Sequence, residues 1–111
     1  MNMLAKTSIQ PPYYAVIFTS VRTEGDGGYG EMAERMAKLV ADQPGFLGMD
    51  SARAGIGITV CYWDSLESIQ RWKEIEEHRV AQTLGQREWY KSYRVRICKV
   101  EMEYGWDFAA P

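Results

Sequence analysis

The order of polar and apolar positions divides the chain into four strand-like and two helix-like segments. From Tyr13 to Val21, aromatic and β-branched residues fall on both sides of the pleat, which indicates a strand buried on both faces. Apolar residues then recur at helical spacing over residues 28–42. Two strand patterns follow at 46–53 and 56–63, and the Ala54-Gly55 turn between them predicts a hairpin.

The second helix is predicted to begin at Asp64 or Ser65, whose side-chain oxygens suit an N-cap. Its apolar side is formed by residues at three-residue steps: Leu66, Ile69, Trp72 and Ile75. We expect a break near Glu77-His78, followed by a short helical piece that ends at Gly85. The last strand is expected over Ser92–Tyr104, where apolar residues alternate with arginines at its start.

This order, β-α-β-β-α-β, predicts an α+β fold of the ferredoxin-like kind, a four-stranded antiparallel sheet with both helices on one face. The domain is expected to span residues 13–104, between an N-terminal tail (1–12) and an unusually apolar C-terminal tail (105–111). Because two helices cover only one face, the apolar residues of the other face predict a homodimer whose two sheets meet as a dimeric α/β barrel.

Composition excludes several classes of protein. The 111 residues are 46% hydrophobic and 25% charged, as in an ordinary single globular domain. The net charge of −2 argues against nucleic-acid binding, and no apolar run reaches the ~20 residues of a membrane span. The N-terminus does not have the pattern of a secretory signal. Cys61 and Cys98 lie in strand patterns without a metal-binding motif, so we expect reduced thiols in a cytoplasmic protein and no metal.

Large rings are concentrated between Thr59 and Tyr90. This stretch holds three of the four tryptophans and the only histidine: Trp63, Trp72, Trp89 and His78. A buried indole needs a partner for its N–H group, so many rings beside one histidine indicate either a large core or a cavity with aromatic walls.

Two segments carry a resemblance to a known family. The sequence QPGFLGMDSARAGIGITVCYWDSLESIQRWKEIEEHRVAQ, followed by GQREWYKSYRVRICKVE, resembles the antibiotic biosynthesis monooxygenase family of dimeric α/β barrels. The resemblance covers residues 13–104, and its marks are Pro44-Gly45-Phe46, Tyr62-Trp63, Trp72 and the segment from His78 to Ala81. Similar domains include oxygenases, haem-degrading enzymes, isomerase-like proteins and members without a known activity, so the resemblance implies the fold more strongly than the chemistry.

The functional residues of the family are only partly present at the matching positions of this chain. Family members that form quinones without metal or flavin use an asparagine, a tryptophan four residues later and a tyrosine six residues beyond. Ser68, Trp72 and His78 stand at those positions, so the tryptophan alone agrees. The haem-degrading branch pairs the tryptophan with a histidine ten residues on, where this chain has Gln82. Haem degradation is therefore disfavoured.

The resemblance implies a cofactor-independent monooxygenase that acts on a phenol- or hydroquinone-like molecule. Neutral imidazole at His78 has a pKa suited to accepting a phenolic proton, and Trp72 would supply a flat wall and one N–H donor. The remaining lining is expected from polar and aromatic residues of the same region: Tyr62, Ser68, Trp89, Tyr90, Tyr93 and Arg94.

A non-catalytic interpretation stays open beside this one. Trp72 can be a core residue and His78 an exposed or capping side chain, in a ligand-binding or structural barrel. The acidic run of Glu74, Glu76 and Glu77 is expected on a solvated helix face.

Overall fold

The structure is a computed structural model that describes residues 4–6, 10–81 and 88–108, with the backbone alone for residues 77–81. Its elements, in chain order, are β1 (Tyr13–Arg22), α1 (Tyr29–Ala41), β2 (Phe46–Arg53), β3 (Gly57–Trp63), α2 (Leu66–Ala81) and β4 (Tyr90–Val100). The predicted β-α-β-β-α-β order is confirmed. No helix among the described residues is long and apolar enough to cross a membrane.

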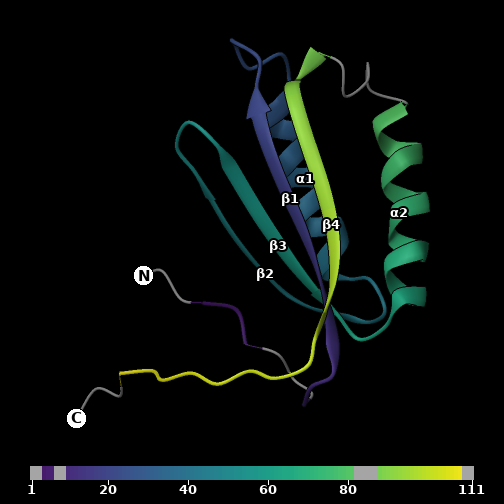
Figure 1. The fold of residues 1–111 in the computed structure, drawn as a ribbon. Coiled ribbons are helices and arrows are strands. Elements are labelled where there is room, and N and C mark those ends of the chain that lie inside the picture. The colour runs from purple at the N-terminus through teal and green to yellow at the C-terminus, as the bar shows by residue number, and fades with distance from the viewer. Residues whose placement is uncertain (1–3, 7–9, 82–87, 109–111) are drawn as a thin grey trace.

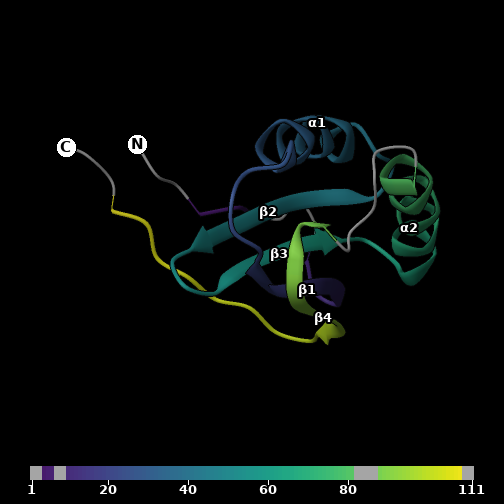
Figure 2. The same ribbon diagram turned by 90° about the horizontal axis from the view of Figure 1, so that it is seen from above.

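The four strands form one antiparallel sheet in the order β2-β3-β1-β4. The central strand β1 pairs with β3 and with β4, so that Val16 lies opposite Cys61 on one side and Ile97 on the other. Val40 of α1 and Ile69 of α2 share a buried cluster with Trp63. Both helices therefore cover the same face of the sheet (Figures 1 and 2).

Alternation along the strands sorts their side chains between two faces. Val16 and Cys61 pack on the buried cluster, so the residues in step with them form the helix face: Tyr14, Phe18, Trp63, Tyr93, Val95 and Ile97. The residues between them form the opposite side, the open face: Ala15, Ile17, Thr19, Ile58, Val60, Tyr62, Arg94, Arg96 and Cys98.

Several local predictions are confirmed. Ser65 caps α2, because its Oγ accepts the Ser68 amide at 3.1 Å. The β2–β3 hairpin closes at the expected place, with the Ala54 N–H donating to the Ile56 carbonyl. At Gly48 the register shifts, and a Cβ there would lie 3.0 Å from the methyl of Ala5, so a close approach accompanies the irregularity.

Two predicted boundaries are wrong. The helix α2 continues to Ala81 without the break expected near Glu77-His78, since no glycine or proline interrupts it there. The last strand runs over Tyr90–Val100 and not over 92–104. Its ladder ends where Val100 pairs with Tyr13, the first residue of β1, because the preceding Pro12 has no N–H to donate.

Candidate active site

Trp72 lies at the edge of the buried cluster between α2 and the sheet. Its ring stacks on that of Trp63, with centroids 6.4 Å apart and planes at 28°. Trp63 is completely buried and meets Phe46 edge to face at 5.4 Å. Trp72 itself is only half-buried. One side of this indole is thus fixed by packing while the rest can contact a ligand.

The helix face is not fully covered along β4. Val95 and Ile97 point to the same side as the helices, yet each is 50% exposed. In Figure 1 α2 stands to the outer side of β4. The two side chains therefore form an apolar strip, partly open to solvent, on the side of the sheet where Trp72 lies.

Glu76 also belongs to this side of α2. It follows Trp72 by four residues, one helical turn, and is half-buried. Burial, and then the negative charge of Glu76, raise the pKa of the Cys61 thiol to about 12. Glu74 is exposed, as expected for the acidic run, whereas Glu76 is only partly exposed, on the side of α2 that follows Trp72. The spacing of Trp72 and Glu76 was the signal in the sequence that could have located it.

An aromatic cluster covers the other end of the helix face. Phe18 stacks on Tyr93 at 5.5 Å and meets Tyr90 edge to face at 5.4 Å, while Tyr90 meets Tyr29 of α1 at 5.7 Å. Burial, and then a hydrogen bond with Tyr29, raise the pKa of the Tyr90 phenol well above its usual value. Tyr90 is therefore a neutral phenol at physiological pH. Tyr93, 39% exposed, is the more accessible ring.

Comparison with known proteins identifies the family. The sequence profile of the antibiotic biosynthesis monooxygenase family matches residues 12–84, which is more than half of the chain. The chain belongs to the antibiotic biosynthesis monooxygenase family.

Relatives and solved structures agree with the assignment. The chain is 55% identical over 105 residues to the uncharacterised protein YqjZ of Bacillus subtilis, covering 93% of this chain and 91% of YqjZ. The fold is similar to that of SnoaB, a cofactor-independent oxygenase from Streptomyces nogalater, with a TM-score of 0.66, 14% identity and coverage of 84% of this chain and 97% of SnoaB. It is also similar to a mutant of MhuD with two manganese protoporphyrin IX molecules bound per active site, with a TM-score of 0.60, 21% identity and coverage of 83% and 98%.

Ser68, at the position of the asparagine expected in quinone-forming members of the family, is built into the start of α2. It is 2% exposed, and its hydroxyl donates to Asp64 Oδ1 at 2.7 Å. Ser68 Oγ also accepts hydrogen bonds from Ser65 Oγ at 3.0 Å and from Arg71 Nη2 at 3.1 Å. A Cβ at Gly45 would collide with this hydroxyl, so the Pro-Gly-Phe turn of the family packs against the same network. Ser68 therefore anchors the helix beneath Trp72.

Trp89 likewise has a partner within the fold. Its ring is 5% exposed, and its indole N–H donates to the Gly27 carbonyl at 3.1 Å. The Trp89 carbonyl accepts from Arg22 Nε at 2.8 Å, and the Arg22 guanidinium lies 3.5 Å from the centre of the Tyr29 ring. Trp89 holds the loop before α1, and Arg22, which the sequence did not single out, joins that loop to the aromatic cluster.

Tyr62 and Arg94 lie on the open face, away from Trp72. The Tyr62 hydroxyl donates to Asp50 Oδ2 at 2.9 Å, and burial and this bond raise its pKa to about 12. Arg94 Nη1 donates to the Tyr93 carbonyl at 2.8 Å. The predicted lining thus separates: Tyr90 and Tyr93 share the face of Trp72, while Tyr62 and Arg94 do not.

His78 belongs to α2, but its side chain lies outside the described part of the chain, as does Gln82. Each residue of an unbroken helix turns by about 100°. Position 78 is therefore about 240° round the helix from Trp72, whereas position 76, one full turn on, is about 40° from it. The described residues contain no group of three histidine, cysteine or acidic side chains able to hold a metal ion.

Proposed function

We propose that the protein is a cofactor-independent monooxygenase that oxidises a small phenol- or hydroquinone-like molecule at the helix face. The observation that carries the proposal is Trp72, stacked on the buried Trp63 and on the same face as half-exposed Val95 and Ile97. A planar aromatic substrate is suited to a flat indole wall and an apolar floor. The fold similarity to SnoaB, a cofactor-independent oxygenase, favours this reaction class.

In the proposed reaction a phenol and O₂ become a quinone and water. One oxygen atom enters the ring as the new carbonyl, the other leaves as water, and all the electrons come from the substrate. The protein has to supply an enclosed site, an acceptor for the phenolic proton and donors for the oxyanion that results. Tyr90, held as a neutral phenol by burial and by Tyr29, suits the role of a donor.

Two residues of α2 are proposed to handle the proton. His78 has the pKa range of a base that works near neutral pH. Glu76 is a partly buried acidic residue one turn beyond Trp72. Activity that rises with a midpoint near pH 6.5 would indicate the imidazole, and a lower midpoint would indicate the carboxylate.

The active form is proposed to be a cytoplasmic homodimer in which two open faces are stacked. Ile56 and Ile58, at the open-face side of the sheet, are 60% and 46% exposed, which favours cover by another chain. Both cysteines are free thiols, and Cys98 is exposed, as fits a reducing compartment.

A ligand-binding barrel without catalysis is the second candidate, favoured by one observation. The Ser68 hydroxyl, at the position of an asparagine in quinone-forming relatives, is fully engaged by Asp64, Ser65 and Arg71. In that candidate the same face would bind an aromatic molecule and release it unchanged.

Oxygen consumption by metal-free purified protein tests the proposal. We expect uptake with at least one electron-rich phenol or hydroquinone, with a quinone as product, and less uptake with Trp72→Ala. Binding of the same phenols, followed by quenching of tryptophan fluorescence, without any oxygen uptake would support the ligand-binding barrel instead.

A further inference from the structure

The C-terminal arm, residues 101–108, carries a strand-like pattern that its own subunit leaves unused. Its even positions are apolar and highly exposed: Met102 (79%), Tyr104 (97%), Trp106 (80%) and Phe108 (75%). Its odd positions include the acidic residues Glu101, Glu103 and Asp107. Strict alternation of this kind is typical of a segment that lays one side on an apolar surface and turns the other to water. Aromatic rings bury about 150–250 Å² each when covered, so the exposed area is large.

Among the described residues, the apolar side chains of the arm stay exposed. Asp107 pairs with Lys6 at 3.3 Å, between side chains that are 67% and 65% exposed. Trp106 and Phe108 contact each other at 6.2 Å rather than the sheet. Figure 1 shows the arm leaving the end of β4 and running away from the helices. The apolar side of the arm therefore needs another surface.

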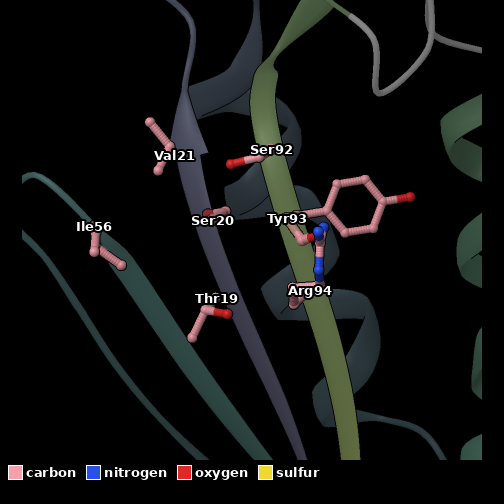
Figure 3. Close-up of a pocket in the computed structure, with 7 residues that line it drawn as sticks. All are labelled: Thr19, Ser20, Val21, Ile56, Ser92, Tyr93 and Arg94. Carbon is pink, nitrogen blue, oxygen red and sulfur yellow. The ribbon is translucent and has the colours of Figure 1, made fainter.

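The open face has a shallow hollow beside two arginines. Its volume is about 300 Å³, and its lining is Thr19, Ser20, Val21, Ile56, Ser92, Tyr93 and Arg94. In Figure 3, Thr19, Val21 and Ile56 lie on one side of β1, and the Tyr93 ring projects to the other side, beyond β4. Arg94 and Arg96 make this part of the open face positive, opposite in sign to the arm.

The position of the hollow suggests which arm fills it. The hollow lies where β1 ends and β4 begins, whereas the arm starts at Val100, at the other end of the sheet. When two sheets stack face to face with their strands antiparallel, the end of β4 in one copy lies over the start of β4 in the other. An extended arm of eight residues reaches about 26 Å, more than the ~14 Å between the outer strands of a four-stranded sheet.

We propose that the C-terminal arm is exchanged between two copies of this chain. The arm of one copy leaves the end of its β4 and reaches the edge of the second copy's open face, where β4 begins. There it places an aromatic side chain in the hollow and brings its acidic residues near Arg94 and Arg96. The inference rests on the homodimer of the proposed function and adds the segment that joins the two copies.

Disulfide trapping tests the exchange. Two chains with Cys61→Ala and Cys98→Ser are prepared, one with Ile56→Cys and the other, carrying a longer tag, with Trp106→Cys. After mixing and mild oxidation, we expect a covalent heterodimer of distinct size on a non-reducing gel. The matched control is Gly105→Cys, which alternation turns to the other side of the arm and which should cross-link much less.

Sedimentation of a chain that stops after Val100 gives a second measurement. We expect it to dissociate at concentrations at which the full chain is dimeric, and Glu103→Arg to weaken the dimer with recovery on adding Arg94→Glu. A dimer equally tight without the arm, together with no cross-link to Ile56→Cys, would overturn the exchange while the homodimer stands. A full-length chain that sediments as a monomer at all concentrations would overturn the homodimer itself.

Discussion

The two faces of the sheet both leave apolar side chains exposed, but different groups stand near them. On the helix face, Val95 and Ile97 share their side with Trp72 and with the carboxylate of Glu76. On the open face, Ile58 lies near a shallow hollow and a row of arginines. Small-molecule sites combine apolar walls with a few convergent polar groups, whereas protein interfaces are broader, with charges at the rim. This difference supports the proposal that the first face carries the chemistry and the second the association of two copies.

The largest expected effect is on the stability of the helix face. Trp63→Ala removes the ring on which Trp72 and Phe46 pack, and should lower the free energy of unfolding by about 3–5 kcal/mol. Urea denaturation, monitored by circular dichroism, measures it. Ile58→Ala on the open face is the control and should cost much less in a monomeric background, because Ile58 is 46% exposed there. Equal losses would contradict the difference in burial between Trp63 and Ile58.

Loss of the proton acceptor is expected to be the next largest effect. Replacing it should lower kcat by ~10²-fold, or about 2.7 kcal/mol in the barrier. His78→Ala and Glu76→Gln are compared by oxygen uptake across pH 5–8, and the variant that loses the pH dependence identifies the base. The double variant should be no slower than the more affected single variant. If both variants turn over as fast as the parent, proton transfer by α2 is wrong and the ligand-binding barrel is favoured.

The sequence was sufficient for those features that depend on near neighbours. The period of apolar residues gave the six elements in order, and Ser65 as a cap and Ala54-Gly55 as a turn need only a few residues of context. The family resemblance that the sequence showed is confirmed by the profile match.

Features that depend on distant pairing could not be predicted. The end of β4 at Val100 is set by Tyr13, nearly ninety residues earlier in the chain. Assignment of Tyr62 and Arg94 to the open face needs the register of three strands, since a shift of one residue would move each to the other face. The partial burial of Glu76 was not predicted for a related reason. The acidic run around it is typical of a solvated surface, and only the packing of α2 near Cys61 sets Glu76 apart from the other acidic residues of the run.

A smaller effect is expected at the start of α2, which supports the helix face. Ser65→Ala removes the cap on the Ser68 amide and should cost about 1 kcal/mol in stability, measured by urea denaturation. Ser65→Thr, which keeps the oxygen, is the control and should lose less. A cost near zero would mean that Asp64 or water replaces the cap.

The smallest expected effect is the pH dependence of stability that comes from a cysteine, since each face of the sheet carries one. Cys61 lies on the helix face and Cys98, which is exposed, on the open face. Burial, and then Glu76, raise the pKa of the Cys61 thiol from 9.0 to about 12, so the folded protein holds this proton more tightly than the unfolded chain. The stabilisation that the raised pKa of Cys61 gives to the folded protein is complete well below pH 9 and is lost as the pH rises from about 9 towards 12.

At pH 9, where half of the thiols in the unfolded chain are ionised, the loss relative to pH 7 is about 0.4 kcal/mol. Urea denaturation at both pH values should detect it in the parent and not in Cys61→Ala, while Cys98→Ser retains it. The same cause predicts that iodoacetamide at pH 8 alkylates Cys98 well before Cys61, since the thiolate is the reactive form. A Cys61 thiol that reacts as fast as Cys98 in a chain ending at Val100 would contradict its burial beneath α2.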